Sequence, residues 1–221
     1  MDGHVVEIKR DILAQNRGEA DALREELAGH GCKLVNVMAS PGAGKTTTIL
    51  ATIAASGIDR SRFAVVEGDI ESFVDSHKVK EAGVKAVQIN TGGACHLDIS
   101  MVRPALELID LDACDAVFVE NIGNLVCPAE FDIGEALKLM ILSVPEGHDK
   151  VLKYPLMFSV ADVVLVNKTD FLALPTNDFD LELFEEYVRR INPAARVFAI
   201  SALTGEGMRE WAAWFTEWLA S

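Results

Sequence analysis

The stretch "KLVNVMASPGAGKTTT", residues 33–48, decides the fold. Its first seven residues are mainly apolar, as in a buried strand. The glycine-rich turn that follows matches the pattern G-x-x-x-x-G-K-[ST], with Ala39 in place of the first glycine. A strand before such a turn and a helix after it are the context in which the pattern binds phosphate. The stretch therefore predicts a phosphate-binding loop (P-loop) in an α/β domain.

The residue types of this loop suit phosphate chemistry. Gly42 and Gly44 allow backbone N–H groups to turn toward phosphate oxygens without a Cβ in the way. The helix that begins near Lys45 adds its partly positive N-terminus. We expect Lys45 to reach the β- and γ-phosphates and the Thr46 hydroxyl to bind Mg²⁺. The predicted contacts of this loop with the nucleotide are Ser40, Pro41, Gly42, Ala43, Gly44, Lys45, Thr46 and Thr47.

Short apolar runs alternate with stretches of helical length along the rest of the chain. The predicted strands are residues 33–39, 62–68, 84–90, 115–121, 139–144, 162–167 and 195–201. Nearly continuous apolar strands that alternate with helices indicate a parallel sheet covered on both faces. The prediction is a P-loop NTPase domain over residues 31–221, with a mostly parallel sheet flanked by helices. Residues 1–30 carry apolar side chains at roughly helical spacing and predict an N-terminal helical segment.

The composition restricts the partners. The formal net charge is −14, which argues against nucleic acid because binding it requires clustered Lys and Arg. No apolar run approaches the roughly 18 residues that a membrane-spanning helix needs. The first residues carry charges where a signal peptide is apolar. We therefore expect a cytoplasmic protein with no nucleic-acid or membrane partner, whose four cysteines are thiols or metal ligands.

The stretch "NKTD", residues 167–170, predicts guanine as the base. At this position the Asp170 carboxylate can accept two hydrogen bonds from the guanine N1–H and N2–H₂ groups, a donor pair that adenine lacks. The motif also supplies Asn167 and Lys168, whose stem can lie along the base. The later stretch "SALTGEG" places Ser201 and Ala202 where GTPases make a second base contact. All these motifs follow predicted strands, where open parallel sheets bind ligands. A P-loop kinase or ATPase is the alternative.

Carboxylates complete the phosphate side. Glu120 heads "ENIG", which resembles the D-x-x-G switch with Glu for Asp, and Gly123 could donate its N–H to the γ-phosphate. Asp69 is expected to hold Mg²⁺ directly or through water, with Asp75 as a second candidate. The predicted catalytic residues are Lys45, Asp69, Glu120 and Gly123, and the predicted Mg²⁺ ligands are Thr46, Asp69 and Glu120. The alternative for the acids is a surface position at a strand end. We expect slow hydrolysis, because the switch motifs contain no Gln or Arg.

The stretch "NTGGACHLD" sets Cys95 beside His96, and Cys127 follows Glu120 by seven residues. All three should lie near the carboxyl edge of the sheet. Two thiolates and one imidazole are a ligand set for Ni²⁺ or Zn²⁺. Three ligands leave a position open, which suits a metal that must leave again.

Two alternatives remain for the cysteines. A Cys-His nucleophile pair would need a reachable base, and adjacent side chains seldom face each other. Buried, inert cysteine is common, and it suits Cys114 and Cys32 better than the cysteines in the glycine- or proline-flanked loops.

The stretches "SPGAGKTT", "TGGACHLD", "ENIGNLVCP", "EGHDKVLKYP" and "NKTD", in this order, resemble the HypB family of hydrogenase-maturation GTPases, which act in nickel insertion into [NiFe]-hydrogenase. The resemblance runs from about residue 33 over nearly the whole remaining chain. It implies a SIMIBI-type GTPase that forms a GTP-dependent homodimer, with Ni²⁺ or Zn²⁺ at Cys95, His96 and Cys127 at the dimer interface. Lys150 or Lys153 would reach nucleotide or partner across that dimer. The related urease-accessory GTPases carry a Cys-Pro-His triplet instead.

The resemblance also implies a role and partners. The expected function is a GTP-binding and GTP-hydrolysing metallochaperone, whose nucleotide state is coupled to metal binding and dimerisation. The first 31 residues hold His4 and His30 and no cysteine, so they lack the N-terminal cysteine motif or histidine-rich tract of some members. Nickel is then expected from a HypA-type metallochaperone and is delivered to the hydrogenase large-subunit precursor. The alternatives are a urease-accessory-like nickel GTPase, or a metal-binding protein whose nucleotide site does not drive transfer.

Overall fold

The computed structural model describes the backbone of residues 8–69 and 74–221, and the side chains from residue 15 onward other than those of residues 69–76. The strands are β1 (Lys33–Ala39), β2 (Phe63–Asp69), β3 (Lys85–Asn90), β4 (Ala116–Glu120), β5 (Leu137–Ser143), β6 (Val163–Asn167) and β7 (Arg196–Ala199). The α-helices are α1 (Ile8–His30), α2 (Lys45–Ser56), α3 (Val74–Glu81), α4 (Ile99–Leu106), α5 (Lys150–Lys153), α6 (Pro155–Val160), α7 (Leu181–Ile191) and α8 (Met208–Ala220).

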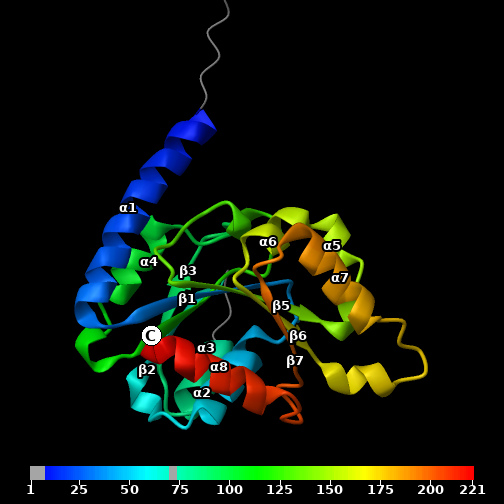
Figure 1. The fold of residues 1–221 in the computed structure, drawn as a ribbon. Coiled ribbons are helices and arrows are strands. Elements are labelled where there is room, and N and C mark those ends of the chain that lie inside the picture. The colour runs from blue at the N-terminus through cyan, green and yellow to red at the C-terminus, as the bar shows by residue number, and fades with distance from the viewer. Residues whose placement is uncertain (1–7, 70–73) are drawn as a thin grey trace, which may run out of the picture.

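The strands form one sheet in the order β3-β2-β4-β1-β5-β6-β7, and every neighbouring pair is parallel (Figure 1). This confirms the predicted α/β fold with a parallel sheet. The observed strand ends differ from the predicted ones by at most two residues. Parallel strands need crossover connections, and helices fill this role between most strands.

Helices cover both faces of the sheet, because its central strands are apolar on both sides. In β4, Phe118 packs with side chains of α2, α3 and α8, whereas Val117 and Val119 pack with side chains of α1 and α4. A third cluster joins β5 and β6 to α6 and α7. The alternation follows from the geometry of a strand, whose successive side chains point to opposite faces. The helices therefore lie on the two faces of the sheet, and the loops that follow the strands lie at its carboxyl edge.

The predicted N-terminal helical segment includes a single helix, α1, while residues 1–7 lie outside the described part of the chain. Leu23 and Leu27 of α1 are buried in the same cluster as β2 and β4. Gly31 ends the helix with a left-handed backbone, φ +67°, and the chain turns directly into β1. Within the described residues, no helix combines the length and the apolar character needed to cross a membrane.

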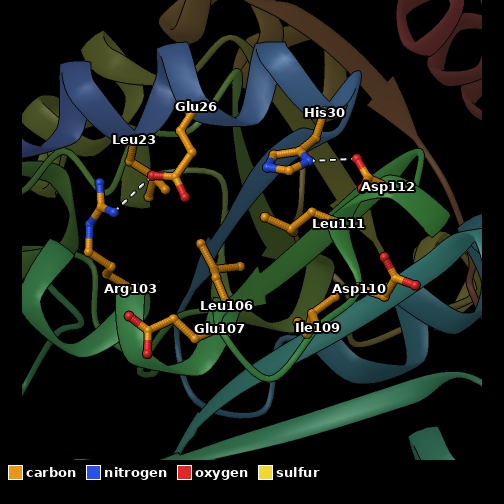
Figure 2. A pocket seen from close by; sticks show the side chains of 10 residues that line it. All are labelled: Leu23, Glu26, His30, Arg103, Leu106, Glu107, Ile109, Asp110, Leu111 and Asp112. Carbon is orange, nitrogen blue, oxygen red and sulfur yellow. Dashed lines mark hydrogen bonds and ion pairs between the residues drawn. The ribbon is translucent and has the colours of Figure 1, made fainter.

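A pocket of about 310 Å³ separates α1 from α4 and the short 3₁₀ helix η2 (Leu111–Ala113). Figure 2 shows two polar pairs across it: Arg103 Nη1 lies 2.8 Å from Glu26 Oε2, and His30 Nδ1 lies 2.7 Å from Asp112 Oδ1. His30 precedes β1 and Asp112 precedes β4, so this pocket lies toward the amino ends of the strands. The pairs tie α1 to the rest of the domain at the edge opposite the P-loop.

Candidate functional site

The P-loop has the predicted conformation between β1 and α2. Gly42 and Gly44 adopt left-handed backbone angles, φ +76° and +97°, which strongly favour glycine. A Cβ on Gly44 would lie 2.7 Å from Asn167 Nδ2, so the loop also needs the space that glycine leaves. The first helical residue of α2 is Lys45, and the N–H groups of the first turn of α2 therefore face the loop.

Three predicted phosphate-side residues meet at the start of α2. The Thr46 hydroxyl donates to the Glu120 carboxylate at 3.1 and 3.0 Å, and Lys45 Nζ lies 3.9 Å from Glu120 Oε1. The hydroxyl and carboxylate oxygens are hard ligands of the kind that Mg²⁺ takes. Asp69 ends β2 beside β4, but its side chain and that of Asp75 lie outside the described residues. The structure therefore brings Thr46 and Glu120 together and gives no position for the other two carboxylates.

The segment after β4 lies against the P-loop. A Cβ on Gly123 would come within 2.9 Å of the Pro41 nitrogen, and the Asn124 N–H donates to the Ala39 carbonyl at 2.9 Å. Gly123 is thus next to the loop, and its contact with the γ-phosphate stays a prediction. A side chain there would push the two loops apart.

The guanine motif is also joined to the P-loop. Asn167 Nδ2 donates to the Ala43 carbonyl at 2.9 Å, and Lys168 Nζ donates to the Gly42 carbonyl at 2.7 Å. Lys168 is the one non-glycine residue with positive φ, +64°, among the described residues. A non-glycine residue seldom adopts this left-handed backbone conformation, so the surrounding structure must hold the backbone of Lys168 in it.

A pocket of about 220 Å³ opens between these motifs. Its lining residues are Gly44, Thr47, Asn167, Lys168, Asp170, Phe171, Ser201, Ala202 and Leu203. Ser201 Oγ donates to Asp170 Oδ1 at 2.6 Å, and the Ala202 N–H donates to Asn167 Oδ1 at 3.1 Å. The predicted base contacts thus share one pocket, with an apolar wall that suits the faces of a purine ring.

Cys95, His96 and Cys127 come together on the loops after β3 and β4. Their ligand atoms all lie within 4.8 Å of one another. Cys95 Sγ is 3.0 Å from Cys127 Sγ and 3.5 Å from His96 Nδ1. The expectation that the adjacent cysteine and histidine do not face each other is wrong, because the loop turns both side chains toward Cys127. Two sulfurs and one imidazole nitrogen fit Ni²⁺ or Zn²⁺.

The protonation of this cluster follows from its surroundings. Burial lowers the pKa of His96, which favours the neutral imidazole that a metal requires. The hydrogen bond to Cys127 is the main cause that raises the pKa of the Cys95 thiol, and burial raises this pKa further. A metal that binds the Cys95 thiolate must therefore displace its proton.

The His96 ring stacks on Phe131, with 3.8 Å between ring centroids and 24° between ring planes. Phe131 was not predicted from the sequence. It lies on the chain between Cys127 and β5, and its contact with His96 depends on how two loops fold against each other. No local pattern signals such a contact.

The two remaining cysteines are buried, as predicted. Cys32 and Cys114 pack in the cluster between the sheet and α1 and α4. Burial raises the pKa of the Cys32 thiol to about 12 and also raises that of Cys114. Both thiols stay protonated and unreactive in this environment.

Lys150 and Lys153 lie in α5. Lys150 Nζ sits 5.3 Å from the centre of the Tyr154 ring, and Lys153 pairs with Asp149 one turn away. Lys153 is exposed and Lys150 half-buried. Their predicted action across a dimer stays a prediction.

Comparisons with known proteins agree with this geometry. A family model described as "CobW/HypB/UreG, nucleotide-binding domain" matches residues 33–199. The "Hydrogenase maturation factor HypB" of Azotobacter chroococcum mcd 1 is 48% identical over 210 residues, 95% of this chain and 68% of that protein. The crystal structure of HypB from Helicobacter pylori in complex with nickel has a TM-score of 0.86 at 36% identity, covering 93% of this chain and 95% of that one.

A more distant structure supports the fold alone. The signal recognition particle 54 kDa protein of Aeropyrum pernix K1, in complex with GDP, has a TM-score of 0.53 at 15% identity, covering 85% of this chain and 48% of that one. This likeness confirms the predicted SIMIBI-type fold. The family model begins at β1 and ends at β7, so it spans the whole sheet together with the P-loop and the cysteine and histidine loops. The chain therefore belongs to the CobW/HypB/UreG family and, within it, to the HypB hydrogenase maturation factors.

Proposed function

We propose that the protein is a GTPase that works as a nickel metallochaperone in [NiFe]-hydrogenase maturation. The observation that carries this proposal is the cluster of Cys95, His96 and Cys127, which lies at the same edge of the sheet as the P-loop. Cys127 follows Glu120 by only seven residues. A residue bonded to the first turn after the P-loop and one of the three clustered ligands are thus joined by a short, continuous segment.

GTP binds across this edge in the proposed complex. Asp170 would hold the guanine, Lys45 and the N–H groups of the P-loop would hold the phosphates, and Thr46, Glu120 and Asp69 would hold Mg²⁺. Gly123 donates its N–H to the γ-phosphate. Water attacks this phosphate slowly, because the switch motifs contribute no Gln or Arg to orient the water or to stabilise the developing charge.

The coupling between nucleotide and metal follows from Glu120. Its carboxylate accepts the hydrogen bond of the Thr46 hydroxyl, and the same two side chains would hold Mg²⁺. A change in the contacts of Glu120 would therefore act on the short segment that leads from the end of β4 to Cys127. Metal affinity then depends on the nucleotide, and by linkage the metal changes nucleotide affinity in return.

Nickel is cargo in this proposal. Three protein ligands leave a coordination position for a second copy of the chain or for the acceptor. GTP-dependent homodimerisation would bring two such sites together. The names of the relatives support hydrogenase maturation as the pathway, and the nickel complex of the Helicobacter pylori protein supports the metal. A HypA-type metallochaperone would supply the nickel and the hydrogenase large-subunit precursor would receive it.

The test is a Ni²⁺ titration by calorimetry, run with GDP and with a non-hydrolysable GTP analogue. We expect the stoichiometry or the affinity to differ between the two nucleotides, and Cys127→Ala to abolish that difference. Cys114→Ala, a change at a buried cysteine outside the cluster, is the matched control and should behave like the unsubstituted protein. Identical nickel binding in both nucleotide states would show that the two sites act independently.

The main alternative is a nickel-binding protein whose nucleotide site does not drive transfer. This alternative predicts that the protein does not hydrolyse GTP, or that Lys45→Ala leaves the rate of hydrolysis unchanged. We expect slow turnover that Lys45→Ala abolishes, measured as phosphate release. The CobW/HypB/UreG model also covers urease-accessory GTPases, but the directly adjacent Cys95 and His96 differ from their Cys-Pro-His triplet.

A further inference from the structure

Asn124 touches both segments that carry the clustered ligands. Its Nδ2 donates to the Cys95 carbonyl at 3.1 Å, and its Oδ1 accepts from the Val126 N–H, next to Cys127, at 2.9 Å. A carbonyl can only accept and a backbone N–H can only donate, so these two partners fix the orientation of the amide group. One side chain therefore bridges the loop after β3 and the loop after β4.

A second asparagine, Asn121, holds the backbone on the C-terminal side of His96. The Leu97 N–H donates to Asn121 Oδ1 at 3.0 Å, and Asn121 Nδ2 donates to Asn36 Oδ1 of β1 at 3.1 Å. Asn121 and Asn36 are completely buried. The carbonyl before His96 and the N–H after it are thus both bonded. Both peptide planes that set the backbone of His96 are fixed, and Phe131 then fixes the plane of its ring.

The segment that holds these groups is itself anchored. The Asn121 N–H donates to the Val37 carbonyl at 3.0 Å, and the Asn124 N–H donates to the Ala39 carbonyl at 2.9 Å. Ala39 begins the P-loop pattern. The amide of Asn124 therefore starts from a backbone position fixed by the P-loop, which is the requirement for a side chain that orients a ligand.

We infer that Asn124 is a positioning residue for the metal site, which holds Cys95 and His96 in place beside Cys127. This inference rests on the proposed function, because it takes the cluster to be the nickel site. Asn124 touches none of the ligand atoms; it acts through the backbone of Cys95. Residues that orient metal ligands in this way typically change metal affinity by about 10–100-fold when they are substituted.

The decisive variant is Asn124→Asp, made in the full chain. Aspartate keeps an oxygen for the Val126 N–H but replaces the donor to the Cys95 carbonyl with a second oxygen, so only the bridge between the two loops is broken. Ni²⁺ alone is titrated, and the thiolate-to-nickel charge-transfer absorption reports both affinity and ligand geometry. We expect about tenfold weaker binding or more, with an altered absorption spectrum.

Asn90→Asp is the charge-matched control. Asn90 is the last residue of β3, just before the loop that carries Cys95, and its Oδ1 accepts from the Gly92 N–H at 3.0 Å, a bond that aspartate keeps. The Asn90→Asp substitution adds the same negative charge to this edge of the sheet and leaves the bond from Asn124 to the Cys95 carbonyl in place. An added carboxylate attracts Ni²⁺, so weaker binding in Asn124→Asp alone cannot come from charge. GDP affinity should stay within about twofold in both variants, because the backbone bond of Asn124 to Ala39 is kept.

Three results would overturn the inference. Asn124→Asp binds Ni²⁺ with unchanged affinity and spectrum, or Asn90→Asp shows the same loss, or GDP affinity falls together with nickel affinity. In these cases the proposed function stands and only the positioning role is lost. An unsubstituted protein that shows no thiolate–nickel absorption would instead overturn the proposed function and this inference with it.

Discussion

Asp170 is the carboxylate that we propose to contact the guanine base. Its Oδ1 accepts a hydrogen bond from the Ser201 hydroxyl at 2.6 Å, which holds the carboxylate in the pocket beside Gly44. A carboxylate has room for several further hydrogen bonds. The guanine N1–H and N2–H₂ groups can supply them, whereas adenine presents an acceptor at N1.

Asp170→Asn tests this choice. The amide turns a donor toward the donors of guanine, and we expect GDP affinity to fall by about 10–100-fold, as for the loss of one or two hydrogen bonds to a charged group. Calorimetric titration with GDP measures the change. The matched control is Asp178→Asn, on an exposed loop outside the pocket, which should leave affinity unchanged. Unchanged GDP affinity in Asp170→Asn, or equal binding of ADP, would rule out the predicted guanine contact.

At the scale of elements, α8 supports the helix that follows the P-loop. Trp211 is completely buried, and its Nε1 donates to Thr52 Oγ1 of α2 at 2.8 Å. The Thr52 hydroxyl in turn donates to the Thr48 carbonyl at 2.7 Å. The C-terminal helix is therefore joined to α2 by a buried polar contact within an apolar interface.

Trp211→Phe should lower the free energy of unfolding by about 1–3 kcal/mol, because it removes a buried hydrogen bond and leaves a small cavity. Urea unfolding followed by circular dichroism measures it. Trp214→Phe removes the same indole from a half-buried position in the same helix and should have a smaller effect. Equal losses in the two variants would mean that the contact with Thr52 contributes nothing.

The attachment of α1 should depend on pH through His30. Its hydrogen bond with Asp112 raises the pKa of His30. A raised folded pKa stabilises the protein below the unfolded value of about 6.5, and this contribution is lost as the pH rises through the folded pKa. His30→Gln should therefore lower the melting temperature more at about pH 5.5 than at about pH 8.5.

Asp112→Asn removes the partner of His30 and should reproduce this dependence on pH. Thermal unfolding at the two pH values measures both variants. If the melting temperature falls by the same amount at both pH values, the pair of His30 and Asp112 does not titrate in this range.

At the scale of the whole molecule, the fold could be predicted because each buried parallel strand is a nearly continuous apolar run. β5 was predicted to begin two residues too late, because Lys138 interrupts its apolar pattern and lies 3.5 Å from the buried Glu135. β7 was predicted to end two residues too late, because Ser201 already turns into the base pocket.

The site could be predicted only in part. Residues that belong to a local motif, such as Lys45 or Asp170, could be proposed from the sequence because the spacing of the motif carries the chemistry. Phe131 and the side-chain bonds of Asn124 were missed, because they depend on the contact between loops that follow different strands. The positions of Asp69 and Asp75 stay predictions, since their side chains lie outside the described residues.

The bonds of Asn167 and Lys168 to the carbonyls of Ala43 and Gly42 have a consequence for the speed of binding. These two bonds join the proposed base motif to the P-loop within the chain itself, so we expect GDP binding to need no slow assembly of the pocket. We expect fluorescently labelled GDP to bind in one fast phase, whose observed rate in stopped flow rises linearly with GDP concentration. A rate that levels off at high concentration would reveal a rearrangement before or after the encounter.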